Sequence, residues 1–301
     1  LSGQHFNNQV TIAEAGGIPP LVVVIGNGSI RAQGQAAGAL AALALDNTKN
    51  ELAIAEQLVE LLGSTNREAS AKAALAISHL ARSHMSNKRS IANAGGVKLL
   101  VKLLEANGVP VDGAVDSKQT ISNADVQKDM ASAVWSMAEN SPENQEAVAR
   151  EGGIPPLIKL LKDSPQVSRE AAGALWSLAA HHGNQQRIAE CGGIMPLISL
   201  LKDGSAGAQE TAAGALHALA EANSNRDAIS SAGGIPLLVA LFDGGSDAAI
   251  EQAAGALQTL VRDNQANQKE IASGLIGILQ GDSQTAQEHV TLVLRDLAKD
   301  P

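Results

Sequence analysis

Three nine-residue stretches decide the fold of this chain: AAGALWSLA at 171–179, AAGALHALA at 212–220 and AAGALQTLV at 253–261. They are nearly identical and stand 41 residues apart. Related stretches elsewhere align on one column of large apolar residues, which consists of Leu43, Leu80, Met137, Leu178, Leu219, Leu260 and Leu297. A repeat of this length indicates stacked helical units that each contact only their neighbours.

A second column runs in the same register and consists of Asn8, Asn50, Asn87, Asn144, Asn184, Asn225 and Asn267. Two independent columns predict seven repeats. Because Asn is a favourable N-cap residue, we expect each of these residues to cap a short first helix.

Most repeats carry Gly-Gly after this first helix and a proline soon afterwards, as in 192–196. Glycine suits the turn that ends a helix, and proline is tolerated in the first turn of the next one. Each full repeat is therefore predicted to hold three helices, of which the third is the Ala-rich stretch.

Three repeats depart from this pattern. The segments 54–63 and 271–281, in repeats 2 and 7, lack the Gly-Gly turn, so we expect their first two helices to be either merged or abruptly joined. Repeat 3 is longer, and the excess at 106–125 is small, polar and without periodicity. It predicts a mobile inserted loop within an otherwise single repeat domain over 1–301.

Composition excludes several classes of protein. The chain has 301 residues, 1% aromatic and 45% hydrophobic, with a net charge of −9. An acidic chain does not favour binding to phosphate backbones, so no nucleic acid is expected as a partner. No apolar run approaches the ~20 residues that span a bilayer, so no membrane insertion is expected.

Catalytic and metal-binding motifs are absent from the sequence. It contains one cysteine, and its histidines lack partners at metal-ligand spacing. No nucleophile elbow, Walker loop or dinucleotide fingerprint occurs. The sequence therefore predicts neither an enzyme nor a cofactor.

The pattern N-x-x-x-[IV]-A-x-x-GG-I-P-P-L followed by AAGAL-W-x-L-A resembles the armadillo repeat family over essentially the whole chain. The resemblance implies an all-α, right-handed superhelical solenoid whose third helices line a concave groove. In the family, such grooves bind extended peptides or partner proteins.

Importin-α receptors of this family carry a Trp and, four residues later, an Asn on each third helix. The corresponding pairs in this chain are Gly38/Ala42, Leu75/His79, Ser132/Ser136, Gly173/Ser177, Gly214/Ala218 and Gly255/Thr259. The chain is instead more similar to scaffold proteins related to β-catenin and to plant and yeast vacuolar armadillo proteins. This similarity implies a cytoplasmic location, with the nucleus as the alternative.

The expected function is that of a non-enzymatic scaffold for protein interactions. One alternative is the substrate-binding region of a larger U-box ubiquitin ligase. Another is an engineered or reconstructed solenoid without a natural partner. Because repeat 1 lacks an evident polar cap, self-association through the N-terminal repeat is also expected as an option.

Candidate partner-binding residues lie on the third helices. Trp135 and Trp176 occupy one position in consecutive repeats, and His217 follows at that position in the next. They either form a shelf for a partner or pack between neighbouring third helices. Ser136 and Ser177 stand where importin-α has Asn, and their short hydroxyl side chains can still form hydrogen bonds.

A charged column precedes these residues by about two helical turns. It begins with Lys128 and Arg169 and continues with Glu210, Glu251 and Glu288. Its sign changes from basic to acidic along the chain. The column is either a solvated face or a surface that steers a partner by its charge. In the second case, the partner should present acidic residues near repeats 3 and 4 and basic residues near repeats 5 and 6.

Overall fold

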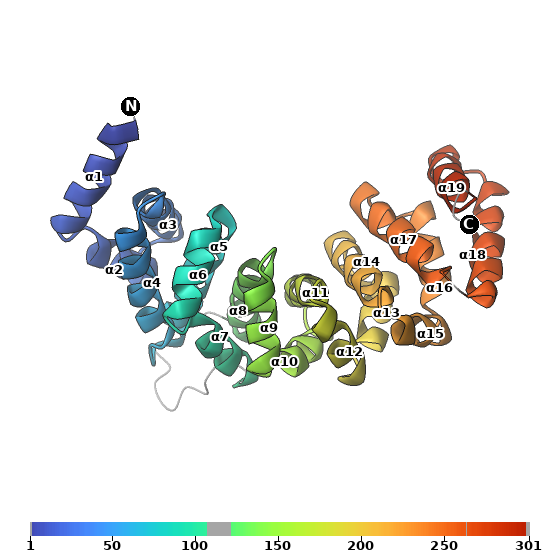
Figure 1. Ribbon diagram of the computed structural model, residues 1–301, viewed down its shortest axis with the longest axis horizontal. Helices are drawn as coiled ribbons and strands as arrows, with labels where there is room; N and C mark the ends of the chain where they lie inside the picture. Colours follow the sequence, from blue (N-terminus) through green and yellow to red (C-terminus); the bar gives the residue numbers. More distant parts are fainter. Residues whose placement is uncertain (1, 107–121, 263, 299–301) are drawn as a thin grey trace. The chain divides into compact units, whose positions relative to one another are not determined.

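The computed structural model describes residues 2–106, 122–262 and 264–298, and every element in these ranges is a helix (Figure 1). The chain divides into two compact units, Leu1–Pro156 and Leu157–Pro301. Helix α10 (Ile154–Leu160) begins in the first unit and ends in the second. The single domain over 1–301 stays a prediction, and the two units are described separately.

The first unit holds repeats 1 to 3 and the start of repeat 4. Its helices are α1 (Ser2–Glu14), α2 (Ile18–Asn27), α3 (Ile30–Ala44), α4 (Thr48–Leu62), α5 (Arg67–Ser83), α6 (Met85–Asn93), α7 (Gly96–Glu105), α8 (Asn123–Ala138) and α9 (Pro142–Arg150). The third helices α5 and α8 pack directly against each other (Figure 1). Buried alanines such as Ala71 and Ala74 allow this close approach.

The second unit continues with repeats 4 to 7. Its helices are α11 (Pro165–Ala179), α12 (His182–Glu190), α13 (Ile194–Asp203), α14 (Ala206–Ala220), α15 (Asn223–Ser231), α16 (Gly234–Ala240) with the 3-10 turn η1 (Leu241–Asp243), α17 (Asp247–Leu260), α18 (Gln265–Leu279) and α19 (Gln284–Leu297). The third helices α11, α14 and α17 pack in sequence, α14 lying between the other two.

The expected exceptions in repeats 2 and 7 are confirmed. Helices α4 and α18 are each continuous over 15 residues, because no Gly-Gly turn interrupts them. For the insertion in repeat 3, residues 107–121 lie outside the described part of the chain. Ser122 caps α8 by accepting from the backbone N–H of Asp125, so 123–125 are helical and do not belong to a loop.

The Gly-Gly turn needs both of its residues. Gly192 has a φ of +79°, a left-handed conformation that side chains with a Cβ rarely adopt. A Cβ on Gly193 would lie 2.8 Å from Cγ2 of Ile188, so the second glycine allows the chain to turn tightly against the first helix. The other four turns repeat both features, at Gly16–Gly17, Gly95–Gly96, Gly152–Gly153 and Gly233–Gly234.

The predicted role of the Asn column as N-caps is wrong. Asn47, and not Asn50, caps α4, and Asn50 lies within the first turn, 3% exposed. Its side-chain Nδ2 donates to the carbonyl oxygen of Leu43, at the end of the preceding third helix (2.9 Å). Equivalent bonds join Asn87 to Leu80, Asn144 to Met137, Asn184 to Leu178, Asn225 to Leu219 and Asn267 to Leu260. The column thus satisfies helix C-terminal carbonyls that would otherwise be buried without a partner.

The residue after the Asn extends this arrangement in several repeats. Gln145 Nε2 donates to the carbonyl oxygen of Ala138 (2.9 Å), and Arg226 Nε donates to that of Ala220 (2.9 Å). Lys88 is 4% exposed and donates forward to the carbonyl oxygen of Glu139. Burial lowers the pKa of the Lys88 ammonium, and the nearby Glu139 opposes that shift. In these repeats a long side chain with a donor group follows Asn and reaches the carbonyls of a helix end, whereas Glu51, which follows Asn50, accepts from Ser86 Oγ (2.7 Å).

Candidate peptide-binding surface

The ring of Trp176 lies flat against the next third helix. A Cβ on Gly214 of α14 would lie 2.6 Å from both Cδ2 and Cε2 of the indole. The next repeat has the same arrangement, because a Cβ on Gly255 of α17 would lie 2.8 Å from Nδ1 of His217. Both rings are half-buried, so each packs on a glycine and still reaches solvent. The packing hypothesis and the partner-shelf hypothesis are thus compatible at these two positions.

An acidic side chain stands one helical turn before each of these glycines. Glu210 precedes Gly214 on α14, and Glu251 precedes Gly255 on α17. Residues four apart share one face of a helix, so each carboxylate lies on the face that carries the ring. Glu210 is half-buried and Glu251 exposed, and neither forms an ion pair within the described residues.

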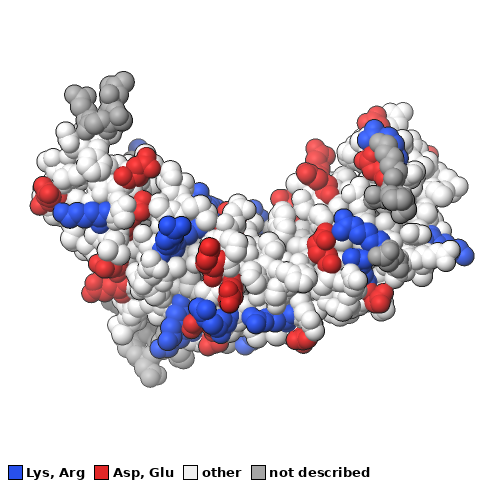
Figure 2. Space-filling view, in the orientation of Figure 1, with Lys and Arg blue, Asp and Glu red and all other residues white. Residues whose placement is uncertain are grey.

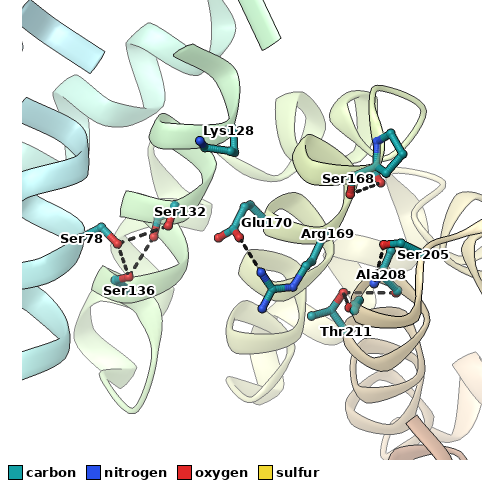
Figure 3. Close-up of polar contacts among 12 residues, drawn as sticks. Ser78, Lys128, Ser132, Ser136, Ser168, Arg169, Glu170, Ser205, Ala208 and Thr211 are labelled. Carbon is teal, nitrogen blue, oxygen red and sulfur yellow. Dashed lines mark hydrogen bonds and ion pairs between the residues drawn. The ribbon is translucent and has the colours of Figure 1, made fainter. Parts of the chain in front are cut away.

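The two basic members of the charged column have acidic neighbours. Arg169 Nη1 lies 3.2 Å from Oε1 of Glu170 (Figure 3), and Lys128 Nζ lies 3.4 Å from Oδ1 of Asp129. The Arg169 side chain also runs along Gly207 of α14, where a Cβ would meet its Cδ and Nε at 2.8 Å. These contacts reduce the positive charge that either residue offers to a partner.

Ser136 lies inside the first unit and does not offer its hydroxyl to a partner. It is 1% exposed, and its Oγ lies 2.8 Å from Oγ of Ser78 on α5 (Figure 3). Arg82 Nε donates to the same oxygen (2.9 Å), and Ser132 belongs to the same cluster. These hydroxyls join α5 to α8. Sequence comparison placed Ser136 at a groove position but did not show that the helices approach closely enough to bury it.

Ser177 is half-buried beside Trp176 on α11. Trp135 is also half-buried, on α8 of the first unit, whereas Trp176 belongs to the second unit. A shelf formed by both tryptophans therefore stays a prediction. Thr259 is buried and donates to the carbonyl oxygen of Gly255 (3.0 Å), so it does not serve as a free hydroxyl.

The first unit has a groove of about 850 Å³ over the N-terminal halves of α3, α5 and α8. Six charged residues line it: Arg31, Glu68, Lys72, Asp125, Lys128 and Asp129. Sequence reasoning found only Lys128 among these. Their common signal is a charged side chain in the first two turns of a third helix. Because the two signs are equal in number, this groove has no net preference for acidic or basic ligands.

Outside these positions, the described surface was compared with the requirements for metal binding and for crossing a membrane. Charged side chains of both signs are interspersed on the face drawn in Figure 2. Within the described ranges, no group of three His, Cys, Asp or Glu side chains could hold a metal ion. No single described helix is long and apolar enough to cross a membrane, and one pair bent by 77°, His5–Glu14 with Ile18–Asn27, meets that test in length and composition only.

A model of the armadillo/beta-catenin-like repeat matches residues 6–44, 141–180, 181–220 and 222–262, more than half of the chain. The chain belongs to the armadillo-repeat family. The matched segments are armadillo repeats 1, 4, 5 and 6, which have the regular three-helix form. Armadillo repeats 2, 3 and 7 fall outside the match, and these are the repeats with a merged helix or an insertion.

Solved structures show the same armadillo fold. An engineered protein from a structural genomics consortium is 29% identical, with a TM-score of 0.67, over 81% of this chain and 96% of its own. Another engineered protein is 29% identical, with a TM-score of 0.72, and the match covers 98% of this chain and 72% of that protein. A designed armadillo repeat protein in complex with the peptide (KR)4 is 24% identical, with a TM-score of 0.65, and the match covers 80% of this chain and 98% of that protein. At this identity the similarity shows the fold alone. The search of curated proteins gave no match.

Proposed function

We propose that this armadillo protein is a non-enzymatic scaffold. Its helices α11, α14 and α17 form the surface that binds an extended peptide, and the peptide carries basic side chains. The supporting observation is the repeated pairing of a half-buried ring with a carboxylate, Trp176 with Glu210 and His217 with Glu251. An armadillo scaffold of this kind acts in the cytoplasm or the nucleus.

The chemistry of each pair suits a cation. The face of an indole attracts an ammonium or guanidinium group, and a nearby carboxylate adds a charge-assisted hydrogen bond. Because Trp176 is held flat by Gly214, it loses little conformational freedom on binding. His217 offers a similar flat surface when neutral, so the Trp176 pair should contribute more to affinity than the His217 pair.

Spacing favours an extended chain over a folded one. The two pairs lie on consecutive repeats at the same register, so a partner meets similar chemistry at a regular interval. Successive side chains of an extended peptide alternate between two faces, so every second residue can face such a surface. The similarity to the designed protein in complex with (KR)4 supports the fold only. The proposed preference for a basic peptide rests on Trp176, Glu210, His217 and Glu251 of this chain.

The test uses a fluorescein-labelled peptide of alternating Arg and Ser, with a Glu-Ser peptide as the charge control, measured by fluorescence anisotropy. The Arg-Ser peptide should bind, and Trp176→Ala should weaken it by about 2 kcal/mol, roughly 30-fold. The double variant Glu210→Lys and Glu251→Lys should slow association and remove most of its salt dependence.

The matched control is Glu190→Lys, an exposed acidic residue on α12, away from the third helices. It changes the charge in the same direction and should leave the affinity within about twofold. Equal binding of both peptides, or wild-type affinity of Trp176→Ala with unchanged helicity, would place the peptide elsewhere on the protein.

A further inference from the structure

Arg82, near the end of α5 in the first unit, is a cation held by neutral groups alone. It is exposed, and it forms no ion pair within the described residues. Its Nε donates to Oγ of Ser136 (2.9 Å), and its Nη2 donates to Oγ of Ser132 (3.3 Å). Because both acceptors are hydroxyls, they fix the direction of the guanidinium and leave its positive charge uncompensated.

The two serine hydroxyls occupy only one edge of this guanidinium. A guanidinium carries a fixed fork of N–H donors, and an anion can bind at the edge of Nε and Nη2 or at the edge of Nη1 and Nη2. In Arg82 the first edge is taken by Ser136 and Ser132. Among the residues that the structure describes, none accepts from the second edge, which can therefore donate two parallel hydrogen bonds to a carboxylate or a phosphate.

The serines can hold the guanidinium because they are fixed themselves. Ser132 and Ser136 are both buried on α8. Ser136 donates to the carbonyl oxygen of Ser132 (2.9 Å), and its Oγ lies 2.8 Å from Oγ of Ser78 on α5 (Figure 3). A guanidinium that is already held in one direction loses little conformational freedom when an anion binds.

The equivalent arginine of the second unit has an internal carboxylate. Arg262 stands two residues after Leu260, the register of Arg82, and its Nη1 lies 3.1 Å from Oε2 of Glu221. Glu221 occupies this register one repeat earlier, where the repeat before Arg82 has Leu45. Arg82 therefore lacks the carboxylate that neutralises its equivalent, and an oxyanion from a partner can take that place.

The face of α5 that carries Arg82 also lines the groove of the first unit. Leu75 borders the groove of about 850 Å³, and His79 and Arg82 follow it by four and seven residues, so all three share one face of the helix. Partial burial of the ring and then the charge of Arg82 lower the pKa of the His79 imidazole. The His79 ring is therefore close to Arg82 and neutral at neutral pH, where it retains one N–H donor.

We propose that Arg82 and His79 bind one oxyanion group of a peptide partner, a carboxylate or a phosphate, at the end of this groove. The free edge of the guanidinium donates two hydrogen bonds to the oxyanion, and the imidazole N–H donates a third. This site lies in the first unit and takes the opposite charge to the surface on α11, α14 and α17, so it is independent of the proposed function.

The test follows the His79 ring by NMR during titration with short peptides that are blocked at both ends. The probes are Ser-Glu-Ser and Ser-phosphoserine-Ser, with Ser-Gln-Ser as the neutral control, and His79→Gln assigns the signal. Each anionic probe should cause a saturable shift with a dissociation constant of about 1–10 mM, and the neutral probe should cause none. Similar affinities would identify a carboxylate as sufficient, whereas an advantage of more than about tenfold for phosphoserine would identify phosphate as the preferred group. Micromolar peptide, as used for anisotropy, should not populate this site.

Two substitutions of Arg82 and a matched control separate the fork from net charge. Arg82→Gln should weaken the anionic probes about tenfold or more, and Arg82→Lys, which keeps the charge without the parallel donors, about threefold. Arg262→Gln removes the same charge at the neutralised equivalent and should leave the affinity within about twofold.

The two proposed sites can fail separately. Trp176→Ala should not change the binding of the anionic probes, and Arg82→Gln should not change the binding of the Arg-Ser peptide. No saturable shift of His79 with either anionic probe would overturn the oxyanion site. Wild-type affinity in Arg82→Gln, with unchanged helicity, would overturn it as well.

Discussion

Replacing Gly214 with alanine tests the packing of Trp176, and Gly38→Ala is its matched control. Both glycines occupy one register of a third helix, and a helical glycine replaced by alanine ordinarily stabilises a protein by about 0.5–1 kcal/mol. At Gly38 a Cβ meets nothing within 4 Å, so this gain should be observed in full.

At Gly214 the new Cβ would lie 2.6–2.9 Å from three atoms of the indole. The ring must move, and such overpacking costs about 1–3 kcal/mol. Since the helix-propensity gain is common to both variants, the difference between their free energies of unfolding should be about 1–3 kcal/mol.

The assay is urea denaturation at low protein concentration, followed by circular dichroism. Emission of Trp176 is recorded in a Trp135→Phe background, where a displaced ring should shift to longer wavelength. In a Trp176→Ala background, Gly214→Ala should increase the free energy of unfolding by as much as Gly38→Ala does in the wild type, because the clash with the indole is gone. Equal stabilisation by Gly38→Ala and Gly214→Ala would refute the proposed seat of the ring.

Two further predictions concern the helix ends and the first unit. Asn144→Ala should cost about 1–3 kcal/mol in denaturation, because it leaves the buried Met137 carbonyl without its donor; Asn8→Ala, at an exposed member of the column, should change stability by less than about 0.5 kcal/mol. The pKa of His79 should lie below 6.5 by NMR titration, since burial and then the charge of Arg82 lower it. The unfolded state then binds a proton more readily, so the contribution of His79 to stability should fall as the pH drops through 6.5. Arg82→Gln should raise this pKa only part of the way, and an unchanged value would remove Arg82 as a cause.

The repeat architecture could be predicted because its determinants recur in the sequence. Gly-Gly turns and the Ala-rich third helices each act locally, so columns at one spacing were enough to place the helices. The merged helix α4 followed from the same logic, since the absence of a turn is also a local signal.

Relations between helices were harder to predict. The preference of Asn for N-caps is real, yet Asn50 bonds to the carbonyl of Leu43 across an interhelical contact. Ser136 occupies a groove position in the alignment and is buried by Ser78 and Arg82. Such outcomes depend on the distance between neighbouring helices, which the sequence of one repeat does not specify.

The ring–glycine pairs show which part of the site a comparison of repeats can and cannot find. Trp176 and Gly214 are 38 residues apart, and so are His217 and Gly255. Each column is visible in the sequence. Their coupling is not, because it follows from the angle at which one repeat stacks on the next.

The most direct test of the peptide-binding surface is the emission of Trp176 during titration of the Trp135→Phe protein with the Arg-Ser peptide. The indole is half-buried, and a basic side chain over its free face would displace water. The account predicts a saturable shift to shorter wavelength whose midpoint matches the anisotropy titration, and its loss in the Glu210→Lys, Glu251→Lys variant. Saturable binding by anisotropy with unchanged Trp176 emission would contradict it.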